Sequence, residues 1–327
     1  MTVDSNESNS RIVSRRTFVA VTGATLGAGL AGCLGDDPQN GDQGDESADF
    51  TVFASMPAVW DFIRQTAGDQ MEAIDLVPVG EHGHDWDPRT DVVEQMDDAD
   101  GFVYLRDFAA WQDDAADQLE RRDDVVVIEA SEGIEFFDSP AEDDDEHWWM
   151  DPVECQTGVE NIADGLAEID PDNADTYEAN TEAFNDELQD LHEEFEEIVE
   201  RATLESLVVA THDSFQWWNR RYGVDIYSPV GTSPDDAASP GDVEEIENLI
   251  EAEGIEYVLY DVGEPGRLAE SLATEVDAEI LPLSPVETQL DGTPEVDTGL
   301  EMEPDWGYVD HFQEINFPTL EQALQTE

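Results

Sequence analysis

Residues 80–88 read Gly80-Glu81-His82-Gly83-His84-Asp85-Trp86-Asp87-Pro88, and this stretch decides the fold. It follows an apolar run, residues 74–79, that predicts a strand, and it precedes a helical pattern starting near Thr90. At least one imidazole is therefore expected on a loop at the carboxyl end of a strand. Open α/β sheets bind their ligands at that edge.

Two later stretches have the same character, His147 to Pro152 and Val209 to Phe215, the second following an apolar run at 207–210. Their histidines, His147 and His212, lie 63 residues after His84 (84 to 147) and 65 residues further on (147 to 212). A single histidine is more often a surface or core residue. These three account for half of the six histidines, and each is flanked by aromatic and Asp residues. Imidazole is a preferred ligand of Zn²⁺ and other borderline first-row metals, so we interpret the three as one metal site.

The residues around these histidines suggest supporting roles. The Asp neighbours could hold the nitrogens that do not bind metal, and the aromatic neighbours could keep the site dry. Those aromatic residues are Trp86, Trp148, Trp149, Phe215 and Trp217. Among the other histidines, His82 is expected to cap its loop or to serve as a spare ligand, and His192 to be solvated, while no pattern supports His311.

The composition is extremely acidic. The 327 residues include 83 Asp and Glu against 12 basic residues, all Arg, giving a formal net charge of -71. Such a chain repels itself in dilute buffer, but in molar salt the Debye length shrinks to roughly 3 Å. Regular apolar periodicity argues against an acidic disordered protein, and no EF-hand loop supports a calcium-binding polyacid. We interpret the chain as the protein of an extreme halophile, a haloarchaeon, with no nucleic-acid partner.

The first 49 residues predict export and anchoring. Arg15 and Arg16 belong to a twin-arginine signal, and a weak apolar run ends in Leu30 to Cys33, which resembles a lipobox. The alternative is an ordinary cleaved signal with a chance cysteine. A lipid on Cys33 would hold the protein on the outer face of the membrane, and would leave Cys155 without a disulfide partner. Signal (1–33) and acidic tether (34–49) then precede the folded part.

Strand and helix patterns alternate from residue 50 onward, which predicts parallel sheets flanked by helices. Between residues 173 and 202 one apolar stripe continues without interruption, and its flanking charges are nearly all acidic, which argues against a coiled coil. We interpret it as a long helix (172–202) that joins an amino-terminal α/β lobe (50–171) to a carboxy-terminal one (203–327). The acidic run 142–146 is expected to be a solvated loop, with a weak cation-attracting lip as the alternative.

At this point the chain resembles a known family, the cluster A-I solute-binding proteins of zinc and manganese ABC importers. The stretches that carry the resemblance are Phe53 to Pro57, Val77 to Gly80, His84 to Pro88, His147 to Pro152, Tyr177 to Asn180, Thr211 to Phe215, and Tyr308 to Leu324. They cover nearly all of residues 50–325. The resemblance implies two α/β lobes joined by one rigid helix, with the metal between them.

The same resemblance implies the ligands and the partners. The family's three histidine ligands map onto His84, His147 and His212, and histidine at the third position favours Zn²⁺, with Mn²⁺ as the alternative. The partner would be an ABC permease, and the protein a monomer that is not an enzyme. The chain departs from the family twice: Ser284 stands where the family usually has Asp, and the long His-rich loop of many zinc-specific members is absent.

The fourth ligand stays open between three candidates. A neutral hydroxyl at Ser284 is a poor Zn²⁺ ligand, so water ranks first, Asp261 is expected to orient an imidazole, and Glu287 ranks next. Two other functions also remain. Three histidines and a water could form a zinc hydrolase, although no HExxH helix or nucleophile elbow is present, and a metal-buffering surface adhesin is the other.

Overall fold

Four parallel strands form the sheet of the amino-terminal half in the computed structural model, which describes residues 50–326 except 85, 90, 91, 93–95, 141 and 234–237. The strands are β1 (Thr51–Ala54), β2 (Glu72–Asp75), β3 (Gly101–Tyr104) and β4 (Val126–Glu129), in the order β2-β1-β3-β4. All three pairings are parallel. Predictions on residues 1–49 lie outside the described residues.

Alternating side chains of these short strands fill two cores. Val52 and Ala54 of β1 share a core with Phe62 of helix α1 (Pro57–Ala67), whereas Phe53 points to the other face and packs near Leu119 of α3 (Ala110–Leu119). This period of two is the one expected of a strand buried on both faces. Helices therefore cover both faces of the sheet, and the loops at its carboxyl edge stay free to carry ligands.

The carboxy-terminal half repeats the arrangement with β5 (Ser206–Val208), β6 (Asp225–Tyr227), β7 (Tyr257–Asp261) and β8 (Glu279–Leu283). The pairs β5-β6 and β7-β8 are parallel, and a parallel bridge between Val209 and Leu259 connects them. Its helices are α6 (Gln216–Tyr222), α7 (Pro240–Glu253), α8 (Arg267–Val276), α9 (Tyr308–His311) and α10 (Phe317–Ala323). The predicted α/β class with parallel sheets is confirmed.

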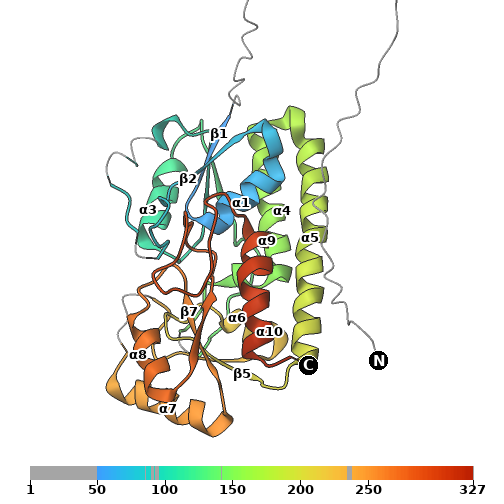
Figure 1. The fold of residues 1–327 in the computed structure, drawn as a ribbon. Helices are drawn as coiled ribbons and strands as arrows, with labels where there is room; N and C mark the ends of the chain where they lie inside the picture. Colours follow the sequence, from blue (N-terminus) through green and yellow to red (C-terminus); the bar gives the residue numbers. More distant parts are fainter. Residues whose placement is uncertain are drawn as a thin grey trace, which may run out of the picture. The chain divides into compact units, whose positions relative to one another are not determined.

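Helix α5 (Ala174–Arg201) runs beside both halves, as Figure 1 shows. Its 28 residues span about 42 Å at the usual rise of 1.5 Å per residue. One stripe is buried, from Tyr177 near its start to Ile198 near its end. The helix packs against α1 and α4 (Pro152–Ile169) of the first half and against α6 and α10 of the second. The predicted long helix is thus present.

Two local predictions differ from the structure. The strand predicted at 74–79 ends at Asp75, because its partner β1 ends at Ala54, directly opposite. Residues 152–169 form α4, a helix that the sequence analysis does not predict, and its first turn is capped by the Asp151 carboxylate accepting from the Val153 amide. No helix among the described residues has the length and apolarity needed to cross a membrane.

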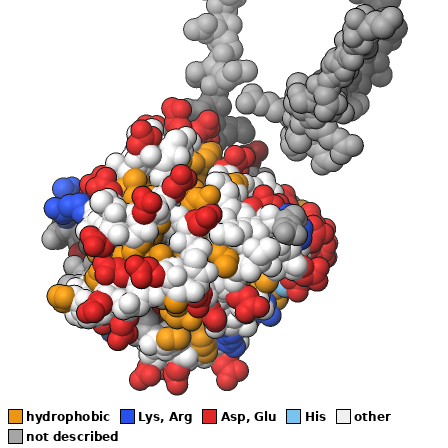
Figure 2. Space-filling view, turned by 60° about the horizontal axis from the view of Figure 1, so that its bottom comes forward, with side chains coloured by type: hydrophobic (Ala, Val, Ile, Leu, Met, Phe, Trp, Pro, Cys, Tyr) orange, Lys and Arg blue, Asp and Glu red, His pale blue; other side chains and the backbone are white. Residues whose placement is uncertain are grey.

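The surface of this unit is acidic, in keeping with the composition. Asp and Glu side chains are spread over the face drawn in Figure 2, with few Arg side chains between them. Most of the acidic residues therefore lie on the surface. A smaller group is buried, and it gathers around the histidines.

Candidate metal centre

Three loops bring His84, His147 and His212 together. His84 follows β2, His147 directly precedes the short 3-10 helix Trp148–Met150 that leads into α4, and His212 follows β5. The ring centroids are 5.5 Å apart for His84 and His147, 5.7 Å for His84 and His212, and 5.9 Å for His147 and His212. The three side chains thus form a triangle built from segments that are far apart in the sequence.

The segment carrying His147 is positioned by close packing. The Trp148 ring lies so near Gly158 of α4 that an added Cβ there would come within 2.4 Å of it. Any larger residue at this position would displace the ring of Trp148, the neighbour of His147. Glycine at 158 therefore allows this close approach of α4 to the Trp148 ring.

Glu287 closes the triangle from the carboxy-terminal half. Its Oε1 lies 3.4 Å from His212 Nε2 and 3.8 Å from His147 Nε2, and its side chain is fully buried. The Glu287 carbonyl accepts the Gly83 amide at 3.0 Å, and the Gln289 carbonyl accepts the Gly80 amide at 2.7 Å. These backbone bonds hold the 80–84 loop against residues 287–289, so His84 and Glu287 are placed together.

Several buried polar atoms of this group have no hydrogen-bond partner among the described residues. They are Nε2 of His84, Nε2 of His147 and Oε2 of Glu287. Buried polar atoms are nearly always paired, because an unpaired one loses its hydration without compensation. Imidazole nitrogens and a carboxylate gathered in this way fit a cation that replaces the protons of the rings, so we infer a metal position between them.

Carboxylates hold the opposite nitrogens of two of these rings. Asp145 Oδ1 lies 3.1 Å from His147 Nδ1, and Glu264 makes a close contact with His212 Nδ1. Such a carboxylate fixes the tautomer, so that Nε2 presents its lone pair. The sequence analysis favours the Asp neighbours for this role, but Asp213 instead accepts from the Gln216 amide at 2.7 Å. Glu264, 52 residues beyond His212, could not be found from spacing alone.

His82 and Asp261 form a third carboxylate–imidazole pair behind the triangle. His82 Nε2 lies 2.9 Å from Asp261 Oδ2, and Asp261 Oδ1 accepts the Gly263 amide at 2.8 Å. His82 Nδ1 accepts the His84 amide at 3.3 Å and lies 3.6 Å from Glu287 Oε2. Both residues are buried, and each is already hydrogen-bonded.

Glu146 lies beside His84 and His147. Its Oε1 is 3.7 Å from His84 Nε2, and burial raises its pKa to about 7. The acidic run is therefore more than a solvated loop at this residue. Asp143 and Asp144 are exposed, as expected for the rest.

The protonation states of the metal-free site follow from burial and from these carboxylates. Burial lowers the pKa of His84 to about 3 and keeps it neutral. Burial also disfavours charge on His147, but the hydrogen bond to Asp145 and the nearby Glu146 and Glu287 outweigh it and raise its pKa to about 9. Burial would raise the pKa of Glu287, yet His212 and His82 hold it well below its usual range. Burial disfavours charge on His212 as well, but Glu287 and Glu264 outweigh it and raise its pKa well above the ordinary value. An incoming cation would therefore displace protons from His147 and His212.

Aromatic rings surround the group, but not all of the predicted ones. The Trp149 ring lies 5.1 Å from the ring of His147, and the indole NH of Trp217 donates to Asp145. Phe108, which the sequence analysis does not single out, lies 4.2 Å from His84 and is the nearest aromatic ring to it among the described residues. It follows β3, whose carboxyl end lies at the same sheet edge.

The remaining predicted residues have other contacts. Ser284 Oγ lies 2.7 Å from His311 Nδ1, and Asn316 bonds both the amide and the carbonyl of Ser284. His192 is half-buried rather than solvated, with Nδ1 3.1 Å from the Tyr222 hydroxyl. His311, without a sequence pattern, is fully buried as the partner of Ser284.

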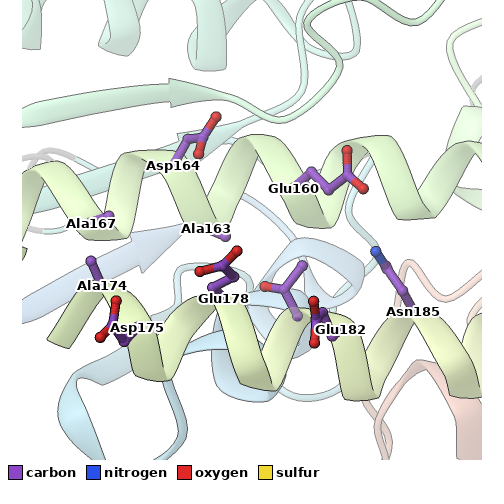
Figure 3. Close-up of a pocket in the computed structure, with 10 residues that line it drawn as sticks. Glu160, Ala163, Asp164, Ala167, Ala174, Asp175, Glu178, Glu182 and Asn185 are labelled. Atoms are coloured by element: carbon purple, nitrogen blue, oxygen red, sulfur yellow. The ribbon is translucent and has the colours of Figure 1, made fainter.

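A separate hollow lies between α4 and α5, and Figure 3 shows its lining. Its volume is about 560 Å³, and none of the histidines lines it. Its acidic lining residues are Glu160, Asp164, Asp175, Glu178 and Glu182. The hollow has no part in the histidine site.

Comparison with known proteins identifies the relatives of this arrangement. The family described as zinc-uptake complex component A, periplasmic (ZnuA), matches residues 52–310. The high-affinity zinc uptake system protein ZnuA of Bacillus subtilis is 24% identical over 309 residues, covering 90% of this chain and 94% of the relative. The zinc-binding lipoprotein AdcA of Streptococcus pneumoniae R6 is 27% identical over 70% of this chain, which spans only 48% of that relative.

Among solved structures, the AdcAII protein of Streptococcus pneumoniae is 25% identical with a TM-score of 0.73, covering 85% of this chain and 100% of that one. The family is a metal-binding transport component and not an enzyme, so the hydrolase alternative has no support. Zn²⁺ is the metal that these relatives support. On a match that extends over most of its length, this chain belongs to the ZnuA family of zinc-uptake components.

Proposed function

We propose that this protein captures Zn²⁺ outside the cytoplasm and delivers it to the permease of an ABC importer. The observation that carries the proposal is the gathering of the three histidines around Glu287, whose Oε1 lies within 3.8 Å of Nε2 of both His147 and His212, while Nε2 of His84 and of His147 are buried without a hydrogen-bond partner among the described residues. Two carboxylates behind the rings, Asp145 and Glu264, give the arrangement expected of imidazole ligands to zinc. The donor set is then three histidines and one carboxylate.

We further propose Glu287 as the fourth ligand, in place of the water that the sequence analysis ranks first. Glu287 Oε1 already lies beside two of the three Nε2 atoms, and its Oε2 has no hydrogen-bond partner. Asp261 is less suited, because both of its oxygens accept hydrogen bonds, from His82 and Gly263. Zn²⁺ accepts nitrogen and carboxylate ligands in tetrahedral sites, whereas Mn²⁺ favours more oxygen.

The test is metal content and affinity of the protein purified in molar salt. One zinc per chain is expected, bound more tightly than Mn²⁺ in direct competition. Combining His84→Ala, His147→Ala and His212→Ala should abolish this binding, while circular dichroism of the variant stays that of the folded chain. Unchanged stoichiometry and affinity in the triple variant would rule out the site.

The route to the membrane is a second part of the proposal. We propose a twin-arginine export signal at Arg15 and Arg16, a lipid on Cys33, and an acidic tether at 34–49 ahead of the two lobes and their linking helix. Cys33→Ser should release the protein into the medium, and replacing Arg15 and Arg16 by Lys should block its export. Retention of the Cys33→Ser protein on membranes would contradict the anchor. We also propose that the protein is a monomer. Deleting its gene should prevent growth under zinc chelation if the protein serves zinc uptake, and should not if it is an adhesin.

Adaptation to molar salt completes the proposal. A net charge of -71 in a chain without lysine is tolerable where carboxylate repulsion is screened within a few ångströms. We expect the melting temperature to fall steadily as salt is lowered from molar to about 0.1 M, where the Debye length grows to about 10 Å. A melting temperature independent of salt over this range would contradict the halophilic interpretation.

A further inference from the structure

Besides Glu287, a second carboxylate lies within ligand distance of the three histidines. In one group, His147, His212 and Glu287 have ligand atoms within 4.8 Å of one another. In a second group, His84, Glu146 and His147 satisfy the same condition. We name the first group the deep set and the second the outer set. His147 belongs to both, so the two sets overlap at a ligand.

Burial orders the two sets along a path from solvent. The side chains of His84 and Glu146 are 10% and 7% exposed, whereas those of the deep set are fully buried. A cation arriving from water therefore meets the outer set first. A bare ion pays a large desolvation cost in a buried site unless protein ligands replace its water. Overlapping sets allow that replacement to occur one ligand at a time.

Glu146 is held in place rather than part of a loose acidic loop. The preceding residue, Asp145, pairs with Phe137 in an antiparallel bridge, and its carboxylate receives the Trp217 indole NH at 3.2 Å. The following residue is His147 itself. The backbone of Glu146 is therefore held on both sides, and its carboxylate lies near two imidazole nitrogens that have no hydrogen-bond partner among the described residues.

A third group, His82, Asp261 and Glu264 with His212, has its ligand atoms equally close together. It differs in how its imidazoles are bonded: His82 pairs with Asp261 at 2.9 Å and His212 is in close contact with Glu264, whereas in the deep set a long hydrogen bond of 3.4 Å joins His212 Nε2 to Glu287 Oε1 and His147 Nε2 has no partner among the described residues. A cation there would have to break both bonds. This group supports the site, and the path ends at the deep set.

We propose that Glu146 is a capture ligand. Zn²⁺ binds first to His84, Glu146 and His147; it then gains His212 and Glu287 as ligands while Glu146 dissociates from it. The inference rests on the proposed function of the site. Release would follow the same path in reverse. Removing a ligand used only in transit should slow binding and release by similar factors, and so leave the equilibrium affinity nearly unchanged.

The experiment is stopped-flow transfer of zinc between the protein and a fluorescent chelator, in molar salt, for the wild type and four variants. Glu146→Gln should slow both association and release at least about tenfold, while the dissociation constant stays within about threefold of wild type. Glu146→Asp, which keeps the charge but withdraws the carboxylate, should slow both rates as well. Asp143→Asn is the matched control, since it removes one charge from an exposed position on the same loop, and it should leave both rates unchanged.

Three outcomes would overturn the inference. Unchanged rates in Glu146→Gln would mean that Glu146 takes no part. Faster release with normal association would make it a permanent ligand. Equal slowing in Asp143→Asn would reduce its role to general electrostatic attraction. The fourth variant, Glu287→Gln, tests the proposed function separately: it should weaken the affinity through faster release, and its failure to do so would count against the deep set and not against Glu146.

Discussion

Two neighbouring groups of side chains in this protein have nearly the same composition and different hydrogen bonding. In the deep set, His212 Nε2 lies 3.4 Å from Glu287 Oε1, and Nε2 of His147 and Oε2 of Glu287 are buried without a hydrogen-bond partner among the described residues. In the supporting group, His82 is bonded to Asp261, and Glu264 to His212. Histidine and carboxylate in proximity are therefore not sufficient evidence for a metal site. What distinguishes the deep set is that two of its buried polar atoms are left unpaired, which points to a ligand there.

The largest expected effect comes from removing the carboxylate of the deep set. Glu287→Gln keeps the size of the side chain but loses the charge beside His147 and His212. The zinc dissociation constant should rise by more than the roughly 10- to 100-fold that loss of an outer partner costs. Competition calorimetry against a chelator measures it. Near-wild-type affinity would mean that water completes the site.

The second effect is a dependence on pH. The pKa of His147 is raised to about 9 in the metal-free chain, from an ordinary 6.5. Burial disfavours charge on His212 too, but Glu287 and Glu264 outweigh it and raise the pKa of His212 well above its ordinary value. Zinc must displace the protons of both rings, so affinity should tighten at least about tenfold per pH unit between 6.5 and 9. The stability of the metal-free fold should depend on pH in the opposite direction. The free energy of unfolding that protonated His147 contributes is complete below pH 6.5 and is lost as pH rises through 9.

Zinc titrations and melting curves of the metal-free protein, both at constant molar salt, check these two slopes. Asp145→Asn provides the comparison, because it removes the hydrogen-bonded partner that helps to raise the His147 pKa. Its affinity should vary less between pH 7 and 9. A wild-type affinity that is flat over this range would contradict the assigned protonation.

The third effect separates the supporting group from the deep set. Glu264→Gln removes the carboxylate behind His212, and Asp261→Asn removes the one behind His82. We expect zinc affinity to fall about 10- to 100-fold for Glu264→Gln, as for other partners of ligating histidines, and less for Asp261→Asn, which acts through His82. Equilibrium competition measures both. An Asp261→Asn loss as large as that of Glu287→Gln would make the supporting group part of the coordination sphere.

The smallest effect is expected at Ser284. Its hydroxyl lies beside His311 and accepts the Val286 amide, and among the described residues no hydrogen bond joins it to His84, His147 or His212. Ser284→Asp, which restores the usual family residue, should therefore leave the preference for zinc over manganese within about threefold, because residues that share no contact usually act independently. It should lower the melting temperature instead, since position 284 is buried. A clear gain in Mn²⁺ affinity would show that residue 284 reaches the metal after all.

The sequence predicts the fold well wherever periodicity and strand pairing agree. The alternation of strand and helix patterns predicts the parallel sheets, and the apolar stripe of α5 marks the long helix within a residue or two. Helix α4 is not predicted, although Asp151 and Pro152 form a good helix start. The strand beyond Asp75 is predicted too long, because apolarity alone does not reveal where its partner ends.

The site is predictable to a similar extent. The spacing and neighbours of His84, His147 and His212 select the residues that the structure brings together. The spacing does not reveal that the Glu287 side chain lies beside the histidines, because its position depends on the backbone hydrogen bonds between Gly83 and Glu287 and between Gly80 and Gln289. Glu264 could not be found for the same reason: it meets His212 only once β5 and β7 lie side by side.

The packing of Trp149 against His147 gives this protein an optical signal of its own. The two rings lie 5.1 Å apart, and the indole is fully buried, with its NH donating to the Pro285 carbonyl. A protonated imidazole quenches an adjacent excited indole by accepting an electron from it, whereas an imidazole bound to zinc carries no such proton. The emission of Trp149 should therefore brighten as the metal arrives, so cargo loading can be followed without any added dye.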